Sequence, residues 1–300
     1  MNRQGKLSSR DLGLELASVC GRHFLKLEHL HYGFWPDGLQ VDIANLRTAQ
    51  DNYTDFLVSH IPDGVETILD VGCGTGGTAK RLVDLGYKVD CVSPSPFLAG
   101  KVRSILPDSK IFECPYEMLQ TNAKYDLIMF SESFQYINIE KSLQQTSALL
   151  NSDGYLLICD VFKKDITAKN VMGGGHKLAK FYHLIADFPF CSVTDLDITD
   201  QTAPSLDILD DAMKNVVAPL IDSGLGFLSA RYPFTLKLLR WKYKKQINKV
   251  YEKYCNGRRT SDDFKKFKTY KLLLFKKGLV TQAVTTDHPA LLHSLPAAPS

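Results

Sequence analysis

Short apolar runs alternate with helically spaced apolar residues through the first half of the chain. Residues 67–71, Thr-Ile-Leu-Asp-Val, form an apolar run that stops at a glycine cluster, which indicates a buried strand. Helical spacing follows over 78–85 before Gly86, and 88–92 forms the next short run. Strands that alternate with helices in this way are typical of a parallel sheet covered by helices on both faces.

The same patterns continue along the rest of the chain. The further elements that they predict are strands at 110–114, 125–130, 155–161, 191–198 and 269–275, a helix at 139–150 and a mostly helical stretch at 205–253. We therefore predict an α/β fold with a doubly wound, mostly parallel, Rossmann-like sheet. A late helical insertion, at about 200–265, is expected to cap the edge of this sheet.

The two ends of the chain differ from its middle. Two stretches with helical spacing, 12–30 and 42–60, predict an N-terminal helical lid over residues 1–60, in front of a core at 61–278. The tail at 279–300 is rich in Ala, Pro, Thr and Ser, and we expect it to be disordered.

Composition narrows the class of protein. Hydrophobic residues at 44% and charged residues at 23% of 300 are ordinary for a globular protein, and a net charge of +3 gives no reason to expect a nucleic-acid partner. No apolar run approaches the roughly 20 residues that span a bilayer, and no secretory signal is visible, so we expect a cytoplasmic protein without an integral membrane segment. The seven cysteines include no Cys-x-x-Cys pair and suggest neither a disulfide framework nor a metal site.

The most specific motif is Glu-Thr-Ile-Leu-Asp-Val-Gly-Cys-Gly-Thr-Gly-Gly at residues 66–77. Its glycines let the backbone approach a ligand closely, and Asp70 can accept hydrogen bonds from a cationic group. The helix that follows offers its N-terminal amides to a carboxylate. Because the glycine spacing differs from the G-x-G-x-x-G of dinucleotide-binding turns, a zwitterionic ligand fits better than a pyrophosphate.

At these residues the sequence resembles the class I S-adenosylmethionine-dependent methyltransferases, and the resemblance extends over about 67–163. It implies that the glycine loop holds the methionine part of S-adenosyl-L-methionine, with S-adenosyl-L-homocysteine as the product. The cofactor-binding residues implied by this first motif are Asp70, Gly72, Cys73, Gly74 and Gly76.

Two later motifs depart from the family pattern. The second strand normally ends in an acid that binds both ribose hydroxyls, whereas here Ser93, followed by Pro94, takes that place. Asp90 lies three residues earlier, where strand alternation points it to the other face, so we expect a modest cofactor affinity.

In the third motif, the resemblance implies an adenine contact from Glu117 or the Tyr116 amide; alternatively, Glu117 is a solvated residue at a helix start.

The end of strand 125–130 supplies candidates for the chemistry. Ligands of open parallel sheets bind at the carboxyl ends of the strands, so we expect Ser131 and Glu132 beside the transferred methyl group. The sequence Glu-Ser-Phe-Gln-Tyr-Ile from Glu132 is similar to small-molecule methyltransferases that act on sterols, tocopherols, terpenoids and phosphoethanolamine. Alternatively, Glu132 caps the next helix.

Residues 31–35, His-Tyr-Gly-Phe-Trp, resemble the N-terminal element of the same enzymes. The resemblance makes Tyr32 a candidate in catalysis and cofactor binding, since an aromatic face attracts a sulfonium and the hydroxyl can hold the methionine carboxylate. Phe34 and Trp35 are more typical of a core or pocket wall. His176 is a further candidate, as a general base, although a lone histidine is usually structural.

Residues 237–253 interleave apolar with basic side chains and predict an amphipathic basic helix. It is either a cap helix with a solvated face or a surface for an anionic substrate, a membrane or a nucleic acid. The sequence leaves the oligomeric state open.

The combined hypothesis is a methyltransferase that acts on a small organic acceptor, apolar or amphipathic, of the natural-product, lipid or isoprenoid type. The alternatives are an RNA or protein methyltransferase and a non-catalytic binding module on the same fold. Carbon, nitrogen and oxygen acceptors all remain open, because they share the same cofactor half.

Overall fold

The computed structural model describes most of the chain: residues 31–166, 172–235, 237–238, 241–245 and 260–278, with Gly21, His23, Leu27 and His29. Most of the helix predicted at 12–30, the end of the basic helix at 246–253 and the tail at 279–300 lie outside the described residues.

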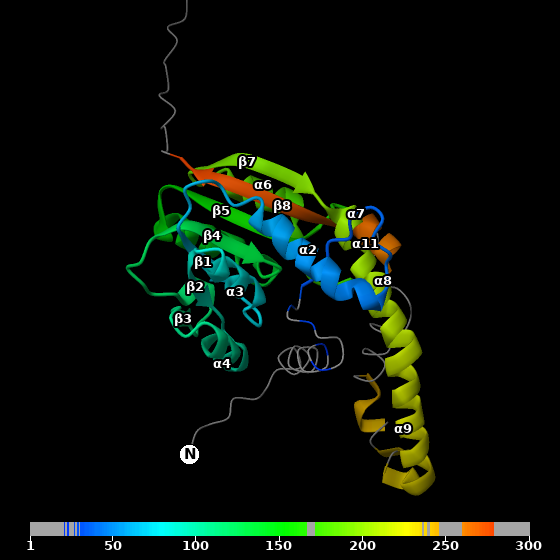
Figure 1. Cartoon of the computed structure of the whole chain (residues 1–300). Coiled ribbons are helices and arrows are strands. Elements are labelled where there is room, and N and C mark those ends of the chain that lie inside the picture. The colour runs from blue at the N-terminus through cyan, green and yellow to red at the C-terminus, as the bar shows by residue number, and fades with distance from the viewer. Residues whose placement is uncertain are drawn as a thin grey trace, which may run out of the picture.

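The strands form one mixed sheet (Figure 1). They are β1 (Thr67–Val71), β2 (Lys88–Val92), β3 (Ile111–Phe112), β4 (Tyr125–Ser131), β5 (Leu150–Lys163), β6 (His176–Lys177), β7 (Phe190–Asp197) and β8 (Lys268–Lys277). The order is β3-β2-β1-β4-β5-β8-β7, with β6 paired to β5. Strands β1 to β6 pair in parallel, whereas β8 is antiparallel to both β5 and β7. The predicted doubly wound, mostly parallel sheet is confirmed.

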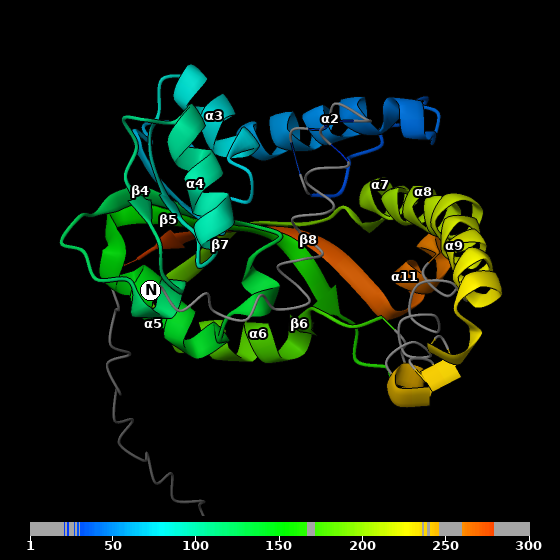
Figure 2. The ribbon, with the colours of Figure 1, turned by 90° about the horizontal axis from the view of Figure 1, so that it is seen from below.

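The helices cover both faces of this sheet. Their bounds are η1 (Ile43–Asn45), α2 (Leu46–Val58), α3 (Gly77–Asp84), α4 (Pro96–Ile105), η2 (Tyr116–Met118), η3 (Phe134–Tyr136), α5 (Ile139–Leu149), α6 (Leu178–Ile185), α7 (Thr199–Thr202), α8 (Pro204–Ala212), the π-helical turn η4 (Met213–Val217), α9 (Ala218–Arg231) and α11 (Ser261–Phe267). Figure 2 shows α2, α3 and α4 on one side of the sheet and α5 and α6 on the other. None of the described helices has the length and apolar character needed to cross a membrane.

Strand β4 shows why the sequence folds in this way. Leu127 and Met129 are fully buried in the cluster that includes residues of α2 and α3, whereas Ile128 and Phe130 join the cluster of α5 and α6. Because both faces are buried, the strand is a continuous apolar run. Truncating such a side chain to alanine typically costs about 2–5 kcal/mol of stability. This packing fixes the position of the carboxyl end of β4, where the candidate residues Ser131 and Glu132 lie.

Residues 31–35 are held between α2 and the start of the insertion. The Phe34 amide donates to the Ala49 carbonyl at 2.7 Å. The Gly33 amide and the Trp35 indole Nε1 both donate to the Ser205 hydroxyl, at 2.9 and 3.0 Å. Helix α9, by contrast, has no buried residue and extends away from the sheet (Figure 1).

Candidate functional site

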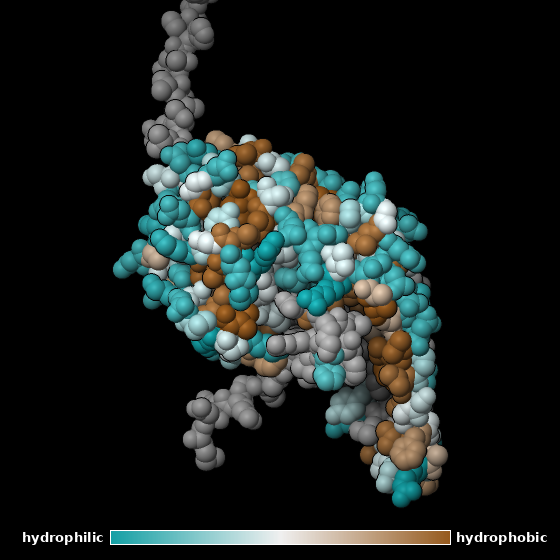
Figure 3. All heavy atoms as spheres, viewed as in Figure 1, coloured by the Kyte–Doolittle hydropathy of each residue, from teal (hydrophilic) through white to brown (hydrophobic). Residues whose placement is uncertain are grey.

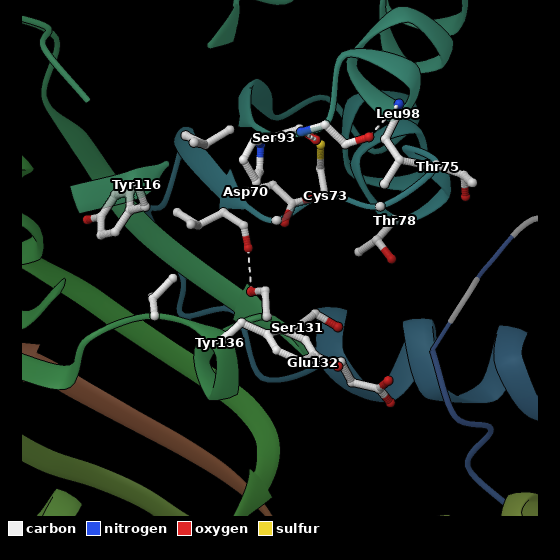
Figure 4. A pocket seen from close by; sticks show the side chains of 18 of the residues that line it. Asp70, Cys73, Thr75, Thr78, Ser93, Leu98, Tyr116, Ser131, Glu132 and Tyr136 are labelled. Carbon is white, nitrogen blue, oxygen red and sulfur yellow. Dashed lines mark hydrogen bonds between the residues drawn. The ribbon is translucent and has the colours of Figure 1, made fainter. Parts of the chain in front are cut away.

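A cavity of about 580 Å³ opens at the carboxyl ends of β1, β2 and β4. Figure 4 shows Asp70 and Ser93 on one side of it, with Ser131 and Glu132 on the opposite side. The predicted site residues that line the cavity are Asp70, Gly72, Cys73, Gly74, Ser93, Pro94, Tyr116, Glu117, Ser131 and Glu132. Tyr32, Gly76 and His176 are not among the lining residues.

The glycine loop needs glycine at two positions for different reasons. Gly72 has a φ of 78°, and a Cβ atom there would lie 2.4 Å from the Ser133 Cβ, so the loop packs closely against the end of β4. Gly74 has a φ of 55°, but a Cβ atom there would meet nothing within 4 Å. The space above Gly74 belongs to the cavity, and a side chain at this position would fill it.

Asp70 is buried at the end of β1, and no described residue donates a hydrogen bond to its Oδ2 atom. Burial raises the pKa of this carboxyl to about 7. A buried acceptor without a donor is costly, because it has lost its water and gained nothing in return. A cationic donor on a ligand in the cavity would offset this cost.

The second strand reaches the cavity with Val92 and is followed there by Ser93, and no acid of β2 lines the cavity. Ser93 is buried there, and its hydroxyl accepts from the Ser95 amide at 3.4 Å. The Asp90 carboxylate accepts from the Tyr125 hydroxyl at 2.8 Å and does not line the cavity. Ser93 therefore offers one neutral group where the family usually has a carboxylate.

Tyr116 and Glu117 border the cavity, but one side-chain oxygen of each is bonded to another part of the protein. The Tyr116 hydroxyl lies 2.9 Å from the Thr146 hydroxyl within the core. The Glu117 Oε1 atom accepts from the Asn138 amide at 3.0 Å. The Tyr116 hydroxyl and the Glu117 Oε1 atom are therefore committed to protein partners.

Glu132 follows β4 with a φ of 53°, an uncommon backbone conformation for a residue other than glycine. Its Oε1 atom accepts hydrogen bonds from the Tyr32 amide and the Tyr270 hydroxyl, both at 2.7 Å. Burial raises the pKa of the Glu132 carboxyl to about 7, although these two hydrogen bonds act in the opposite direction. A carboxyl with such a pKa can accept a proton near neutral pH.

Two tyrosines that the sequence did not single out extend this arrangement. The Tyr270 hydroxyl lies 3.0 Å from the Tyr53 hydroxyl, which lies 3.1 Å from the Ser131 hydroxyl. Burial raises the pKa of both phenols well above the ordinary value, so they stay protonated. Glu132 and Tyr270 are 138 residues apart, and no local pattern marks either tyrosine.

His31 was also not predicted, although it lies in the aromatic segment. It lines the cavity, and its ring stacks near Tyr53 with centroids 4.4 Å apart. Burial, assisted by the neighbouring His29, lowers the pKa of His31 to about 3. The ring is therefore neutral and gives this wall of the cavity a weakly polar character.

The remaining three candidates lie just outside the cavity. The ring centroids of Tyr32 and Tyr270 lie 6.0 Å apart. The backbone amide of Tyr32, rather than its ring, contacts Glu132. Gly76 precedes α3, where a Cβ atom would lie 2.9 Å from Ile105. His176 Nε2 lies 3.1 Å from the Phe134 carbonyl, because pairing of β6 with β5 places it behind η3.

Residues 44–196 match the family described as methyltransferase domain. The chain belongs to the class I S-adenosylmethionine-dependent methyltransferases. Among curated relatives, an uncharacterized methyltransferase of Alkaliphilus oremlandii is 25% identical over 122 residues, which cover 40% of this chain and 56% of that protein. The chain thus spans about half the length of the first relatives that it matches.

Solved structures of methyltransferases share the fold of this chain. A Galdieria sulphuraria protein assigned as a sarcosine dimethylglycine methyltransferase superposes with a TM-score of 0.64 at 17% identity, covering 88% of this chain and 97% of that one. Geranyl diphosphate C-methyltransferase from Streptomyces coelicolor was solved in complex with geranyl diphosphate and S-adenosyl-L-homocysteine. It superposes with a TM-score of 0.61 at 16% identity, covering 87% of this chain and 92% of that one.

S-adenosyl-L-methionine is the cofactor of this methyltransferase family, and the residues present fit it. The Asp70 Oδ2 atom lacks a donor from any described residue, as expected for a partner of the cofactor's ammonium group. The space above Gly74 leaves room for the same part of the cofactor.

Proposed function

We propose that this methyltransferase transfers the methyl group of S-adenosyl-L-methionine to a small apolar or amphipathic acceptor of the natural-product, lipid or isoprenoid type. One observation carries the proposal. Glu132, with a pKa of about 7, faces the same cavity as the unpaired Asp70 from the opposite side. A cofactor subsite and a proton acceptor thus share one cavity.

Different residues of the chain would hold different parts of the cofactor. Asp70 would accept from the ammonium group, and the amides at the start of α3 would face the methionine carboxylate. Ser93 would meet a ribose hydroxyl, and the backbone around Tyr116 would border the adenine. These roles rest on the order of the residues along the cavity wall.

Bound in this way, the cofactor supplies a methyl group on a sulfonium that already is an activated leaving group. The protein therefore mainly aligns the acceptor and excludes water. Glu132 takes up the proton when the acceptor atom carries one. The Tyr32 amide and the Tyr270 hydroxyl hold the carboxylate in position while its second oxygen stays available.

The character of the cavity supports a small acceptor of low polarity. Its wall includes the apolar side chains of Val71, Leu98 and Ile137, together with the neutral ring of His31. A volume of about 580 Å³ suits a cofactor with a compact acceptor. The geranyl diphosphate of the Streptomyces enzyme is an acceptor of this amphipathic kind.

The test is transfer of a radiolabelled methyl group from the cofactor to small-molecule extracts, with cofactor binding measured by calorimetry. We expect Gly74→Asp to abolish both, because the new side chain would occupy the space above the loop. Gly64→Asp is the matched control, since Gly64 also has a positive φ of 82° and an open Cβ direction but lies outside the cavity.

Full binding and transfer in folded Gly74→Asp would refute the cofactor subsite. Cofactor binding without transfer to any fraction of the extract would instead favour a non-catalytic binding module.

A further inference from the structure

A helical arm, formed by the described residues within 213–245, leaves the body of the protein after α8. It consists of η4 and α9, followed by helical residues at 233–235, 237–238 and 241–245 among those described. None of the residues of α9 is buried, and Figures 1 and 2 both show it at the periphery, away from the sheet. The arm contributes nothing to the cavity.

The arm carries an unusual amount of exposed apolar surface. The described chain has 20 exposed large hydrophobic side chains, and ten of them lie between Val216 and Tyr243. Phe234 is 87% exposed and Trp241 is 78% exposed. Figure 3 shows hydrophobic residues, in brown, along the projecting α9. A patch of this kind marks a surface that meets an apolar partner.

The arm is also the basic part of the chain. Residues 213–245 contain seven Lys or Arg residues and one acid, Asp222, a net charge of +6. The other residues contain 29 basic and 32 acidic side chains, a net charge of −3. No ion pair joins Lys237, Lys242, Lys244 or Lys245 to any carboxylate of the described residues. The arm thus combines exposed apolar groups with four lysines that have no counter-ion among the described residues, whereas Lys214 at its start pairs with Asp210.

We propose that the helical arm docks on the surface of an anionic lipid bilayer. Phe234 and Trp241 would enter the boundary between headgroups and acyl chains, while the lysines reach the anionic headgroups through their flexible stems. The net negative charge of the rest of the chain keeps the body away from the same surface, which favours contact through the arm alone.

Charge and apolar character together distinguish the lipid surface from other partners. Two copies of the arm would bring two charges of +6 together, which opposes self-association. A nucleic acid would satisfy the lysines, but it would leave exposed aliphatic side chains of the same arm, such as Leu220 and Ile221 at 68% and 50% exposure, in water. A bilayer surface satisfies both and needs no shape complementarity.

The test uses the full chain and two kinds of vesicle, one of phosphatidylcholine alone and one of equal parts phosphatidylcholine and phosphatidylserine. We expect cosedimentation with the anionic vesicles and little with the neutral ones. Trp35 is 5% exposed, so a blue shift of tryptophan fluorescence on binding would report on Trp241. In Trp241→Phe the shift should disappear while cosedimentation persists.

Matched variants locate the binding surface. Phe234→Ser with Trp241→Ser, and separately Lys242→Gln with Lys244→Gln, should each weaken vesicle binding by about tenfold or more. The controls are Leu85→Ser with Val193→Ser, and Lys88→Gln with Lys110→Gln, which change exposed residues of the body. The controls should bind as the unchanged protein does. Because all these side chains are exposed, the melting temperature should stay the same.

Several results would overturn the proposal. Vesicle binding that is absent, or that survives both pairs of arm substitutions, removes the arm as a lipid-binding surface. A fluorescence shift that rises with protein concentration in the absence of lipid would identify a second copy as the occupant. Binding to homopolymer RNA without binding to vesicles would identify a nucleic acid. None of these outcomes bears on methyl transfer, which is measured separately.

Discussion

Asp70 and Glu132 form opposite walls of one cavity, and burial raises the pKa of each to about 7. Their surroundings nevertheless differ. The Oδ2 atom of Asp70 has no donor from a described residue, whereas Glu132 Oε1 already has two. The Asp70 wall is therefore incomplete without a ligand, and the Glu132 wall is preorganised. In the proposed function, a similar pKa shift would accompany a binding role for Asp70 and a proton-accepting role for Glu132.

The largest effect should come from Glu132→Gln. Removing the proton acceptor should lower kcat by about 10²–10⁴-fold, the usual size of a general-base contribution. The cofactor Kd should stay nearly the same, because Asp70 is untouched. Steady-state kinetics with calorimetry would separate the two quantities. A variant with full kcat would show that Glu132 accepts no proton.

Asp70→Asn should weaken cofactor binding rather than lower kcat. Loss of a charge-assisted hydrogen bond of about 1.5–3 kcal/mol predicts a cofactor Kd that is weaker by about 10–150-fold. The kcat at saturating cofactor should change little. Asp90→Asn is the control, since Asp90 is bonded to Tyr125 outside the cavity. If both variants bound S-adenosyl-L-homocysteine equally well, the cationic subsite would not be at Asp70.

Tyr270→Phe tests the preorganisation of Glu132. The Tyr270 hydrogen bond lowers the pKa of Glu132, so its loss should raise that pKa and move the acid limb of the pH profile of kcat/KM upward. We expect a fall in kcat/KM of about tenfold, as for one hydrogen bond to a charged group. Tyr182→Phe, which removes an exposed hydroxyl bonded to Asp195, should do neither. An unmoved profile would place Tyr270 outside the reaction.

The pH dependence of cofactor binding should follow the ionisation of the Asp70 carboxyl. A carboxyl is charged above its pKa, so with a pKa of about 7 the binding form of Asp70 becomes more abundant as pH rises from 6 to 7. The ammonium group of the ligand stays protonated over this range, and affinity should therefore increase about fivefold. Calorimetry at several pH values would show this rise, and Asp70→Asn should abolish it.

The smallest effect concerns the position where the family usually has an acid. Ser93→Asp should tighten cofactor binding a few-fold, because a carboxylate makes stronger hydrogen bonds to ribose hydroxyls than a serine does. Calorimetric titration is the measurement, with circular dichroism to show that the fold is intact. The absence of any gain in a folded variant would mean that the ribose lies elsewhere.

The Asp70 wall could be predicted from sequence because its groups lie within a few residues of one strand end. The alternation of strands and helices predicted where that strand end lies in the sheet. The observed bounds of β1, β2 and β4 match the predicted ranges closely. The Glu132 wall could be predicted only in part. Tyr53 reaches it from α2 and Tyr270 from β8. The two tyrosines are 217 residues apart in the chain, and tyrosines in apolar segments look like ordinary core residues.

Some elements were also not predicted. Helix α4 begins with Ser95 as its cap and Pro96 in its first turn, a recognisable start, but Gly100 interrupts its short apolar pattern. Strand β5 is longer than the predicted 155–161, because Asp153 and Gly154 lie within it rather than ending it. The lid and cap divisions of the chain remain predictions.

The short segment 31–35 links the start of the insertion to Glu132, because the Gly33 amide donates to Ser205 and the Tyr32 amide donates to Glu132. If the Tyr32 amide moved away from Glu132, the carboxyl would lose a donor and meet water. Rehydration would return its acidity toward that of an ordinary glutamate, whose pKa is 4.5. The Glu132 carboxylate would then be a weaker base than it is in its present buried setting, so the contacts of segment 31–35 with Ser205 and Glu132 help to set its basicity.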